Sequence, residues 1–586
     1  MSGFCGWINF DGAPIDRALF AKMVESFSLS APDGSASWID ANVAFGYSHL
    51  KTHVHQAMLP ATLDGRALIT SDVRLDERES LASVVGTTPD RADHELVLGA
   101  YARWGEACAP HFLGDFAFAI WNRDTRELFC ARDHFGTKPF YFVRRGAMFV
   151  FASAIAPLRL IASDALDHHA IEDFLLFGWH QDRERTTFRD IRCLPAAHAM
   201  RVDASGVKTT EYWTLPIESP MRGDPVEGFR DVLSRAVRDR TPAKVTVSLS
   251  GGLDSSSIAS LAGDVTSNID AFTIVFDSLI PDDERPYATS VANRFDIRHH
   301  IIDGGAYRLF DDRAPKDQPG NDPLSAISSD MHAAAATHAR VMLAGQGGDA
   351  VLYASHSYFF NLLRRGHLLR FAQEMVGYTW RKRRLPPLGL RSSFRRTLRL
   401  RKKFEARPPW VKGDELQKRW EEHLGDEPEI HPTRPQAYNL LRGAGWQRLS
   451  EYLDPAAMGV PLEYRNPYLD LRVVRYLLRV PPMPWFAEKE ILRRAMDGKL
   501  PEDVRTRRKT ALRVDPTHVL MTRQAEELAA IIESCQALDP FVDRAVAAAA
   551  VRNPRRTPFQ SYLLGFPVGL ALWLQRTAHD RLILPE

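Results

Sequence analysis

The strongest chemical signature in the chain is the stretch SGGLDSS at 250–256. It follows the apolar segment KVTVSLS, which is typical of a buried strand, and it leads into a stretch typical of a helix. Such a loop directs backbone N–H groups toward an anion, and its glycines let a phosphate approach the backbone closely. Asp254 can bind a Mg²⁺ that the bound phosphates share. We therefore predict a phosphate-binding loop, distinct in spacing from the Walker A motif, formed by Ser248, Leu249, Ser250, Gly251, Gly252, Asp254, Ser255 and Ser256.

The elements that must position this loop follow from the pattern around it. Short apolar segments at 244–250, 270–276 and 339–345 alternate with helical stretches, which is typical of a parallel α/β sheet. The first half differs, because residues 116–153 read as consecutive β-hairpins. Between the halves, residues 203–225 are polar and rich in Gly and Pro, as expected of a crossing between domains. We predict an α/β protein with a β-rich first unit.

Composition excludes several function classes. The 586 residues include 75 Lys and Arg against 73 Asp and Glu, so no overall charge favours nucleic acid or a membrane. No leader-like segment and no apolar run of about 18 residues occurs, which argues against export and membrane insertion. The five cysteines form no CxxC motif and suggest neither a disulfide framework nor a zinc site. We expect a cytoplasmic enzyme.

SGGLDSS resembles the pyrophosphate-binding loop of the ATP-pyrophosphatase enzymes. LAGQGGDAVLYA at 343–354, LEYRNPYLDLRVV at 462–474 and KEILRRAMDGKLPEDVRTRRKT at 489–510 are similar to the synthetase domain of asparagine synthetases. APDG at 31–34, ADHELV at 92–97 and RDHFGTKPFYF at 132–142 resemble the glutaminase domain of the same enzymes.

This resemblance to the asparagine synthetase superfamily implies a domain plan. An N-terminal Ntn-hydrolase-type αββα sandwich, a degenerate glutaminase, would span 1–205, and a linker would span 206–225. A doubly wound parallel-sheet ATP-pyrophosphatase domain would span 226–586, with a basic insertion at about 355–430.

The resemblance also implies the ligands and roles of a synthetase site. ATP would lie on the predicted loop, with its adenosine near the TIVF strand at 273–276 and near Gly345 and Gln346. Mg²⁺ would lie between Asp254 and Asp349. Two lysines would stabilise negative charge and one of two glutamates would orient the amine, the candidates being Lys489, Lys509, Glu451 and Glu463.

The glutaminase half departs from the family pattern. The family nucleophile is the first residue of the mature chain and uses its own amine as base, whereas Cys5 has four residues ahead of it. Thr70, Ser71 and Asp72 stand where the family has Asn-Gly-Glu, and His49 stands where it has an arginine. Of the glutamine-binding set, Asp93 alone remains. We predict that Cys5 is a core thiol in an inactive domain.

A synthetase without its own ammonia source must take an amine from elsewhere. β-Lactam synthetases place a tyrosine, and asparagine synthetases a glutamate, where this chain has Gln346, which cannot act as a base. A peptide α-amine, with an ordinary pKa of about 8, needs little base assistance. The chain thus most resembles the cyclases that close the macrolactam ring of lasso peptides. A glutamine-hydrolysing asparagine synthetase and a β-lactam synthetase-like amide ligase are the alternatives.

Partners follow from this interpretation. The substrate would be a ribosomally made precursor peptide, with a leader peptidase and a leader-binding protein as further partners and with no nucleic acid or membrane. The segment 364–410 contains 15 Lys and Arg against 2 acids. It is either a solvated surface insertion or a docking surface for an acidic peptide or a partner enzyme.

Histidine pairs at 53/55, 168/169 and 299/300 lack the spacing of metal ligands and are expected to be solvated or capping.

Overall fold

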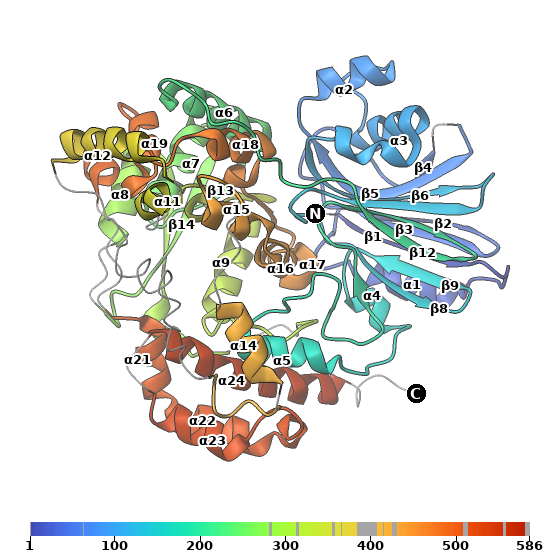
Figure 1. The fold of residues 1–586 in the computed structure, drawn as a ribbon. Helices are drawn as coiled ribbons and strands as arrows, with labels where there is room; N and C mark the ends of the chain where they lie inside the picture. Colours follow the sequence, from blue (N-terminus) through green and yellow to red (C-terminus); the bar gives the residue numbers. More distant parts are fainter. Residues whose placement is uncertain are drawn as a thin grey trace.

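The structure is a computed structural model in which a β-rich unit stands beside a unit built on a parallel sheet (Figure 1). Lys509 and most of the basic segment 364–410 lie outside the residues that it describes. The described residues are 2–62, 64–280, 284–311, 316–353, 358–364, 366–383, 407–413, 415–424, 430–507, 514–554 and 558–580.

The first unit contains two antiparallel sheets of six strands each, counted over the described residues. The first sheet has the order β10-β8-β9-β1-β3-β2 and comprises β1 (Gly3–Asn9), β2 (Ser35–Asp40), β3 (Val43–Ser48), β8 (Tyr141–Arg145), β9 (Met148–Ala152) and β10 (Arg192–Cys193). The second has the order β12-β11-β7-β6-β5-β4 and comprises β4 (Ala61–Thr62), β5 (Ala67–Leu75), β6 (Gly114–Asn122), β7 (Glu127–Arg132), β11 (His198–Asp203) and β12 (Gly206–Glu211).

The two sheets pack face to face because each strand alternates apolar side chains toward the space between them. Phe4, Phe45, Phe118 and Phe151 are buried in this shared core. Helix α1 (Arg17–Glu25) and the short α4 (Ala156–Arg159) lie on the first sheet, and α2 (Arg78–Val85) and α3 (Asp93–Trp104) lie on the side of the second. The predicted αββα sandwich and its hairpins are confirmed.

The predicted boundary of this unit is wrong by a few residues. Residues 206–211, which the sequence placed in the linker, form β12 and pair with β11 along its whole length. The strand GVKTTE is polar because it is an edge strand whose last four residues are all exposed, on both faces. The connection to the second unit therefore begins after Glu211.

The second unit is built on a parallel sheet with the order β15-β14-β13-β16-β17 in the described part of the chain. Its strands are β13 (Val245–Ser248), β14 (Ile269–Val275), β15 (Arg298–Asp303), β16 (Val341–Leu343) and β17 (Glu463–Arg465). The order runs outward from β13 in both directions, which confirms the doubly wound prediction. Helix α6 (Val226–Arg240) precedes the first of these strands. The helices that follow them include α7 (Leu253–Gly263), α8 (Glu284–Arg294), α9 (Ser325–His338), α10 (Gly348–Val351), α18 (Leu471–Arg479), α19 (Glu490–Ala495) and α20 (Glu502–Thr506).

Further helices cover one end of the second unit (Figure 1). The last of them, α24 (Pro558–Asp580), packs against α5 (His168–Phe177), a helix of the first half of the chain. Phe174 and Phe566 are in contact there, with ring centroids 5.6 Å apart. Among the described residues no helix is both long and apolar enough to cross a membrane. The remaining helices are α5 (His168–Phe177), α11 (Tyr358–Arg364), α12 (Leu368–Lys382), α14 (Leu416–Leu424), α15 (Pro435–Arg442), α16 (Ala444–Tyr452), α17 (Pro455–Met458), α21 (Pro516–Arg523), α22 (Ala525–Ser534), α23 (Arg544–Arg552) and α24 (Pro558–Asp580).

The insertion at 355–430 is not uniformly a surface feature. Trp420 of α14 is 1% exposed and stacks on Phe177 of α5, with ring centroids 5.9 Å apart. Arg419 forms an ion pair with Glu172 at 2.7 Å. In contrast, Trp380 of α12 is 82% exposed. The insertion thus joins the core through α14, while α12 buries Tyr378 and presents its opposite face, with Trp380, to solvent.

Candidate active site

The predicted phosphate-binding loop lies at the carboxyl end of β13, where Ser248 ends the strand and Gly252 caps α7. Gly251 has φ +67°, and a Cβ there would lie 2.7 Å from the backbone nitrogen of Ala288, so no other residue fits. The hydroxyls of Ser250 and Ser255 are 3.0 Å apart and fold the loop over the first turn of the helix. The loop therefore offers backbone and hydroxyl groups at a helix N-terminus, where an anion is favoured.

A second predicted segment packs directly on this loop. It follows β16, and a Cβ on Gly345 would lie 2.8 Å from the backbone nitrogen of Ser255. A Cβ on Gly348 would lie 2.7 Å from the carboxyl group of Asp254. Because glycines allow this close approach, Asp349 is brought to the side of Asp254. Two segments that are about ninety residues apart in the sequence thus form one site.

Lys489 joins the two aspartates. Its ammonium group forms an ion pair with Asp254 and lies 2.6 Å from Oδ1 of Asp349. Glu488 and Lys489 have φ values of 55° and 57°, in the left-handed region. Each such residue costs about 1–3 kcal/mol, a strain that is typical of functional sites. The structure therefore holds Lys489 in a costly conformation that directs its charge at the predicted metal ligands.

Arg507 is a candidate that the sequence reasoning missed. Its guanidinium group lies 4.1 Å from the ring centroid of Tyr287, and one of its nitrogens is 3.4 Å from the carbonyl oxygen of Gly251. The signal was its place in the TRRKT motif, two residues before Lys509. Lys509 itself is outside the described residues.

A cavity of about 1020 Å³ extends from this site to the β-rich unit. Its lining includes Ser248 and Gln346, which lie beside the phosphate-binding loop, and Tyr141 and His180, which belong to the first half of the chain. The side-chain oxygen of Gln346 is buried and has no hydrogen-bond partner among the described residues. A polar atom of this kind is available to a ligand in the cavity.

Glu451, the first of the two candidate glutamates, lines this cavity. It forms ion pairs with Arg448 at 2.6 Å and with Arg132 of the β-rich unit at 3.1 Å. Burial would raise the pKa of Glu451, but the two arginines outweigh burial and lower it to about 2. Glu451 therefore stays ionised at neutral pH and cannot take a proton from an amine.

Glu463, the second candidate, is not among the residues that line the cavity in the described part of the chain. It is buried at the contact between the two units, 2.6 Å from Arg465 and 3.3 Å from Lys138. Burial opposes ionisation, but these cations hold the pKa of Glu463 well below its ordinary value. The geometry therefore gives Glu451 contact with the cavity and gives Glu463 a place in the interface.

The residues at the positions of the family's glutaminase site are either buried or paired with other residues of the chain. Cys5 is fully buried in the apolar cluster under α1, and burial raises the pKa of its thiol. A thiolate is the nucleophilic form of cysteine, so this thiol is unsuited to attack. Asp93 forms an ion pair with Arg78 and a hydrogen bond of 2.6 Å with His53, whose pKa burial lowers, so the expectation of a solvated or capping His53 is wrong.

Ser2, rather than Cys5, lies beside the predicted glutamine-binding position His49. The Tyr47 hydroxyl donates a hydrogen bond to Ser2 Oγ at 2.8 Å and lies 2.9 Å from Nδ1 of His49. Asp72 is also paired, with Lys138 at 2.9 Å. The sequence reasoning missed Ser2 because it looked for a thiol.

Comparison with known proteins extends this description. The asparagine synthase family profile matches residues 228–575, and the profile of the glutamine amidotransferase domain matches residues 1–213. Asparagine synthetase [glutamine-hydrolyzing] 3 of Bacillus subtilis is 25% identical over 558 residues, which cover 87% of this chain and 86% of the relative. A putative asparagine synthetase [glutamine-hydrolyzing] of Mycobacterium bovis is 26% identical over 606 residues and covers 91% of each chain.

One solved structure overlaps the fold only in part. Glutamine phosphoribosylpyrophosphate amidotransferase from Bacillus subtilis, complexed with ADP and GMP, is 13% identical. It covers 51% of this chain and 65% of its own, with a TM-score of 0.28, which is too low to carry an argument.

Proposed function

This chain belongs to the asparagine synthase family and is an ATP-dependent carbon–nitrogen ligase that forms AMP; from that premise we propose that it closes a macrolactam ring in a ribosomally made peptide of the lasso class. Its curated relatives are asparagine synthetases, so the family alone is equally compatible with that activity. The substrate must be argued from the site.

The cavity is the observation that carries the proposal. Its volume of about 1020 Å³ is at the upper end of the range for sites that enclose a drug-sized molecule, and far above the need of one amino acid. It opens beside the ATP loop at Gln346 and continues to His180 of the β-rich unit. A folded peptide that presents both a carboxylate and an amine at the ATP loop would use this space.

The burial and pairing of the residues at the glutaminase site also support a peptide substrate that carries its own amine. Cys5 is buried under α1, Asp72 is paired with Lys138, and Asp93 is paired with Arg78 and hydrogen-bonded to His53. Binding glutamine there would require these buried ion pairs to break, at a cost of about 3–5 kcal/mol for each unpaired charge. An amine carried by the substrate avoids this cost.

The proposed chemistry has two steps. The side-chain carboxylate of an Asp or Glu in the peptide attacks the α-phosphorus of ATP, which forms an acyl-adenylate and releases pyrophosphate. The α-amine of the same peptide then attacks the acyl carbon, forms the amide and releases AMP and a proton. Release of AMP and pyrophosphate therefore distinguishes this enzyme from a ligase that releases ADP and phosphate.

Residues of the chain have separate roles in these steps. The loop at 250–256 binds the phosphates through its backbone and hydroxyls, and Lys489 stabilises the negative charge that develops on them. Asp254 and Asp349 are hard oxygen ligands that fit Mg²⁺, which would screen the phosphate charge when bound. Because Lys489 pairs with both aspartates, its ammonium must move toward the phosphates as they bind.

The amine needs orientation more than a base. Glu451, with its pKa held at about 2 by Arg448 and Arg132 against the effect of burial, can attract an ammonium group but cannot deprotonate it. The free oxygen of Gln346 can accept a hydrogen bond from the amine. A β-lactam synthetase-like ligase, with a less acidic amine, would need a base that neither residue provides.

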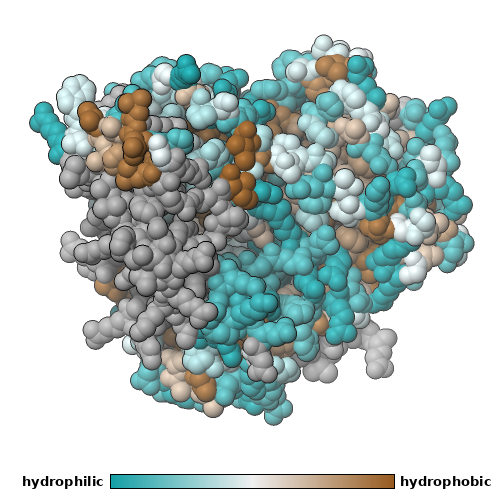
Figure 2. Space-filling model, viewed as in Figure 1, coloured by the Kyte–Doolittle hydropathy of each residue, from teal (hydrophilic) through white to brown (hydrophobic). Residues whose placement is uncertain are grey.

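We further propose that the exposed part of the insertion docks the precursor peptide. Leu369, Val376 and Trp380 of α12 are 75%, 69% and 82% exposed and share one helix face. Figure 2 shows exposed apolar side chains where Figure 1 places α12. Since this helix lies in a strongly basic segment, an acidic amphipathic part of the peptide would fit it. Trp380→Ser should weaken binding of the full precursor and leave the cyclisation of its isolated core unchanged.

A product assay tests the proposed function. Purified protein receives ATP and Mg²⁺ with aspartate plus glutamine, with aspartate plus ammonium, or with a precursor peptide encoded beside its gene. AMP and pyrophosphate should appear with the peptide alone. Formation of asparagine at a comparable rate would overturn the proposal in favour of an asparagine synthetase.

A further inference from the structure

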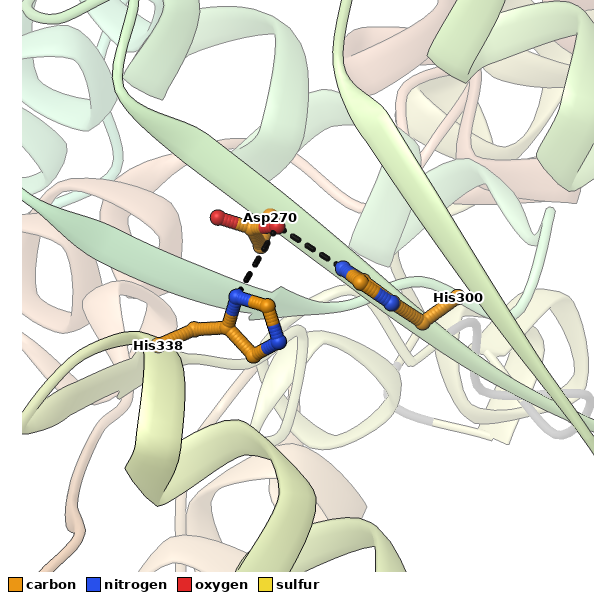
Figure 3. A group of neighbouring side chains, drawn as sticks. All are labelled: Asp270, His300 and His338. Atoms are coloured by element: carbon orange, nitrogen blue, oxygen red, sulfur yellow. Dashed lines mark hydrogen bonds and ion pairs between the residues drawn. The ribbon is translucent and has the colours of Figure 1, made fainter.

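Two histidines and an aspartate converge at the amino-terminal edge of the parallel sheet (Figure 3). Asp270 is the second residue of β14, His300 lies on the neighbouring strand β15, and His338 is the last residue of α9. Nε2 of His300 is 2.7 Å and Nδ1 of His338 is 3.3 Å from Oδ1 of Asp270. The phosphate-binding loop follows the opposite, carboxyl-terminal edge, so this cluster is separate from the proposed active site.

The distances suit a zinc ion. Zinc binds His nitrogen and carboxylate oxygen at about 2.0–2.2 Å in tetrahedral geometry, which separates its ligand atoms by roughly 3.3 Å. The three candidate ligand atoms all lie within 4.8 Å of one another. The pair formed by His338 and Asp270 already has the required separation, and the pair formed by His300 and Asp270 would open by about half an ångström.

Hydrogen bonds alone account poorly for the arrangement. Arg298 also lies 3.3 Å from Oδ1 of Asp270, so three nitrogens surround one oxygen that offers about two lone-pair sites. The side chain of Arg298 is 70% exposed and can turn into solvent. A metal cation bound by Asp270 and the two imidazoles would neutralise the carboxylate without Arg298.

The rings are held in the orientation that coordination needs. Phe272, two residues after Asp270, stacks on His300 with ring centroids 4.6 Å apart and an interplanar angle of 13°. The same phenylalanine packs against the edge of His338 at 5.7 Å. Fixed ligand orientation is what the surroundings of a metal site normally supply. The expectation that His300 is a solvated or capping histidine is therefore wrong.

We propose that Asp270, His300 and His338 bind one Zn²⁺ ion. The ion would join β14, β15 and the end of α9, elements that are otherwise linked at this edge by packing and hydrogen bonds. Both histidines are partly exposed, which leaves the fourth position to water. Because the cluster lies at the edge away from the ATP loop, the ion stabilises the fold and does not take part in the ligation.

The test is metal binding by the full chain. Protein is stripped with a chelator, and Zn²⁺ is added without nucleotide and in excess Mg²⁺, which occupies carboxylate-only sites. Equilibrium dialysis with elemental analysis should find one tightly bound Zn²⁺ per chain, and Co²⁺ in its place should give a visible absorption band. Adding Zn²⁺ should also raise the thermal midpoint.

Matched variants assign the ion to the cluster. His338→Ala and Asp270→Asn should each weaken Zn²⁺ binding at least tenfold and remove the Co²⁺ band. His299→Ala changes the adjacent histidine, whose Nε2 contacts Thr273 instead, and should keep both. A wild-type protein without stoichiometric Zn²⁺ would overturn the proposal. So would equal Zn²⁺ affinity in wild type and the folded His338→Ala protein, with folding checked by circular dichroism.

Discussion

Lys489 Nζ lies 2.6 Å from Oδ1 of Asp349 and pairs at the same time with Asp254, so residues from three separate segments of the chain meet at one point. The two carboxylates belong to the segments that pack through Gly345 and Gly348. A cation at this position keeps two aspartates close together in the free enzyme and lies beside the predicted phosphate-binding loop. We therefore expect adenylation to depend on the charge of Lys489.

Lys489→Met should lower AMP formation with the peptide substrate by about 10²-fold or more, because a preorganised charge is lost from the transition state. Lys499→Met is the matched control, since Lys499 forms a more exposed ion pair with Asp264. The measurement is the rate of pyrophosphate release at saturating ATP. Activity of Lys489→Met within a few-fold of wild type would remove this residue from the mechanism.

Glutamine should not be hydrolysed. Neither Cys5→Ala nor Ser2→Ala should change ligase turnover by more than a few-fold, because Cys5 is buried under α1 and the Ser2 hydroxyl is already bonded to Tyr47. Glutamate release is measured with and without ATP. Release that disappears in either variant would identify a working glutaminase and its nucleophile.

Lys138→Met should destabilise the protein by about 3–5 kcal/mol. It leaves Asp72 and Glu463 as buried carboxylates without the lysine that lies 2.9 and 3.3 Å from them. The urea midpoint of the β-rich unit measures the effect, and Lys208→Met on the exposed face of β12 is the control.

A double variant tests whether Lys138 and Glu463 act as a pair across the two units. Lys138→Met combined with Glu463→Gln should cost less than the sum of the single changes, since it removes one of the stranded charges. Strict additivity would mean that the two residues stabilise the protein independently.

Asp454 should make the stability of the folded protein depend on pH. Burial raises the pKa of Asp454 to about 7 in the folded chain, against about 3.9 when unfolded. Between these values the folded state keeps a proton that the unfolded state has lost, so stability falls as pH rises through this window. Asp454→Asn keeps the cap on Ala456 N and should be more stable than wild type at pH 8, by up to about 4 kcal/mol.

Unfolding curves measured at pH 8 and near pH 4 check this dependence. The difference between Asp454→Asn and wild type should shrink as the pH falls, because the carboxyl of the unfolded chain also takes up its proton as the pH approaches about 3.9. A difference that stays constant with pH would show that Asp454 is ionised in the folded protein.

The parts of the fold that depend on a local pattern of apolar residues could be predicted from the sequence. Hairpin alternation at 116–153 and the short apolar segments of the parallel sheet both appear as predicted, since their periods reflect which side chains are buried. The boundary at 206 failed because β12 is a polar edge strand whose pairing with β11 depends on the tertiary fold. Burial of one part of the insertion through Trp420 depends likewise on α5, more than two hundred residues away.

The motifs of the site could be predicted from the sequence, but the contacts between their residues could not. The loop at 250–256 and Asp349 each carry a recognisable pattern, and the structure brings them together with Lys489. The choice between Glu451 and Glu463 depends on which partners the β-rich unit places opposite each of them. Asp270, His300 and His338 come from three elements with no spacing motif, so their meeting could only be seen in the fold.

The amine should set the pH dependence of the reaction. With little base assistance, kcat/KM should rise with pH along one limb near pH 8, the ordinary pKa of a peptide α-amine. Gln346→Ala should lower the rate modestly without moving this limb, because an amide does not titrate. A limb that moves in this variant would mean that an enzyme group, rather than the substrate, controls deprotonation.

The most direct test of macrolactam formation is the mass of the product from two versions of one core peptide. With ATP and Mg²⁺, the peptide with a free α-amine should lose the mass of one water and release one AMP for each ring formed. An N-acetylated copy of the same peptide should give no cyclic product, because its nitrogen cannot attack the acyl-adenylate. Conversion of the acetylated peptide to a product lacking one water, at a comparable rate, would contradict the account.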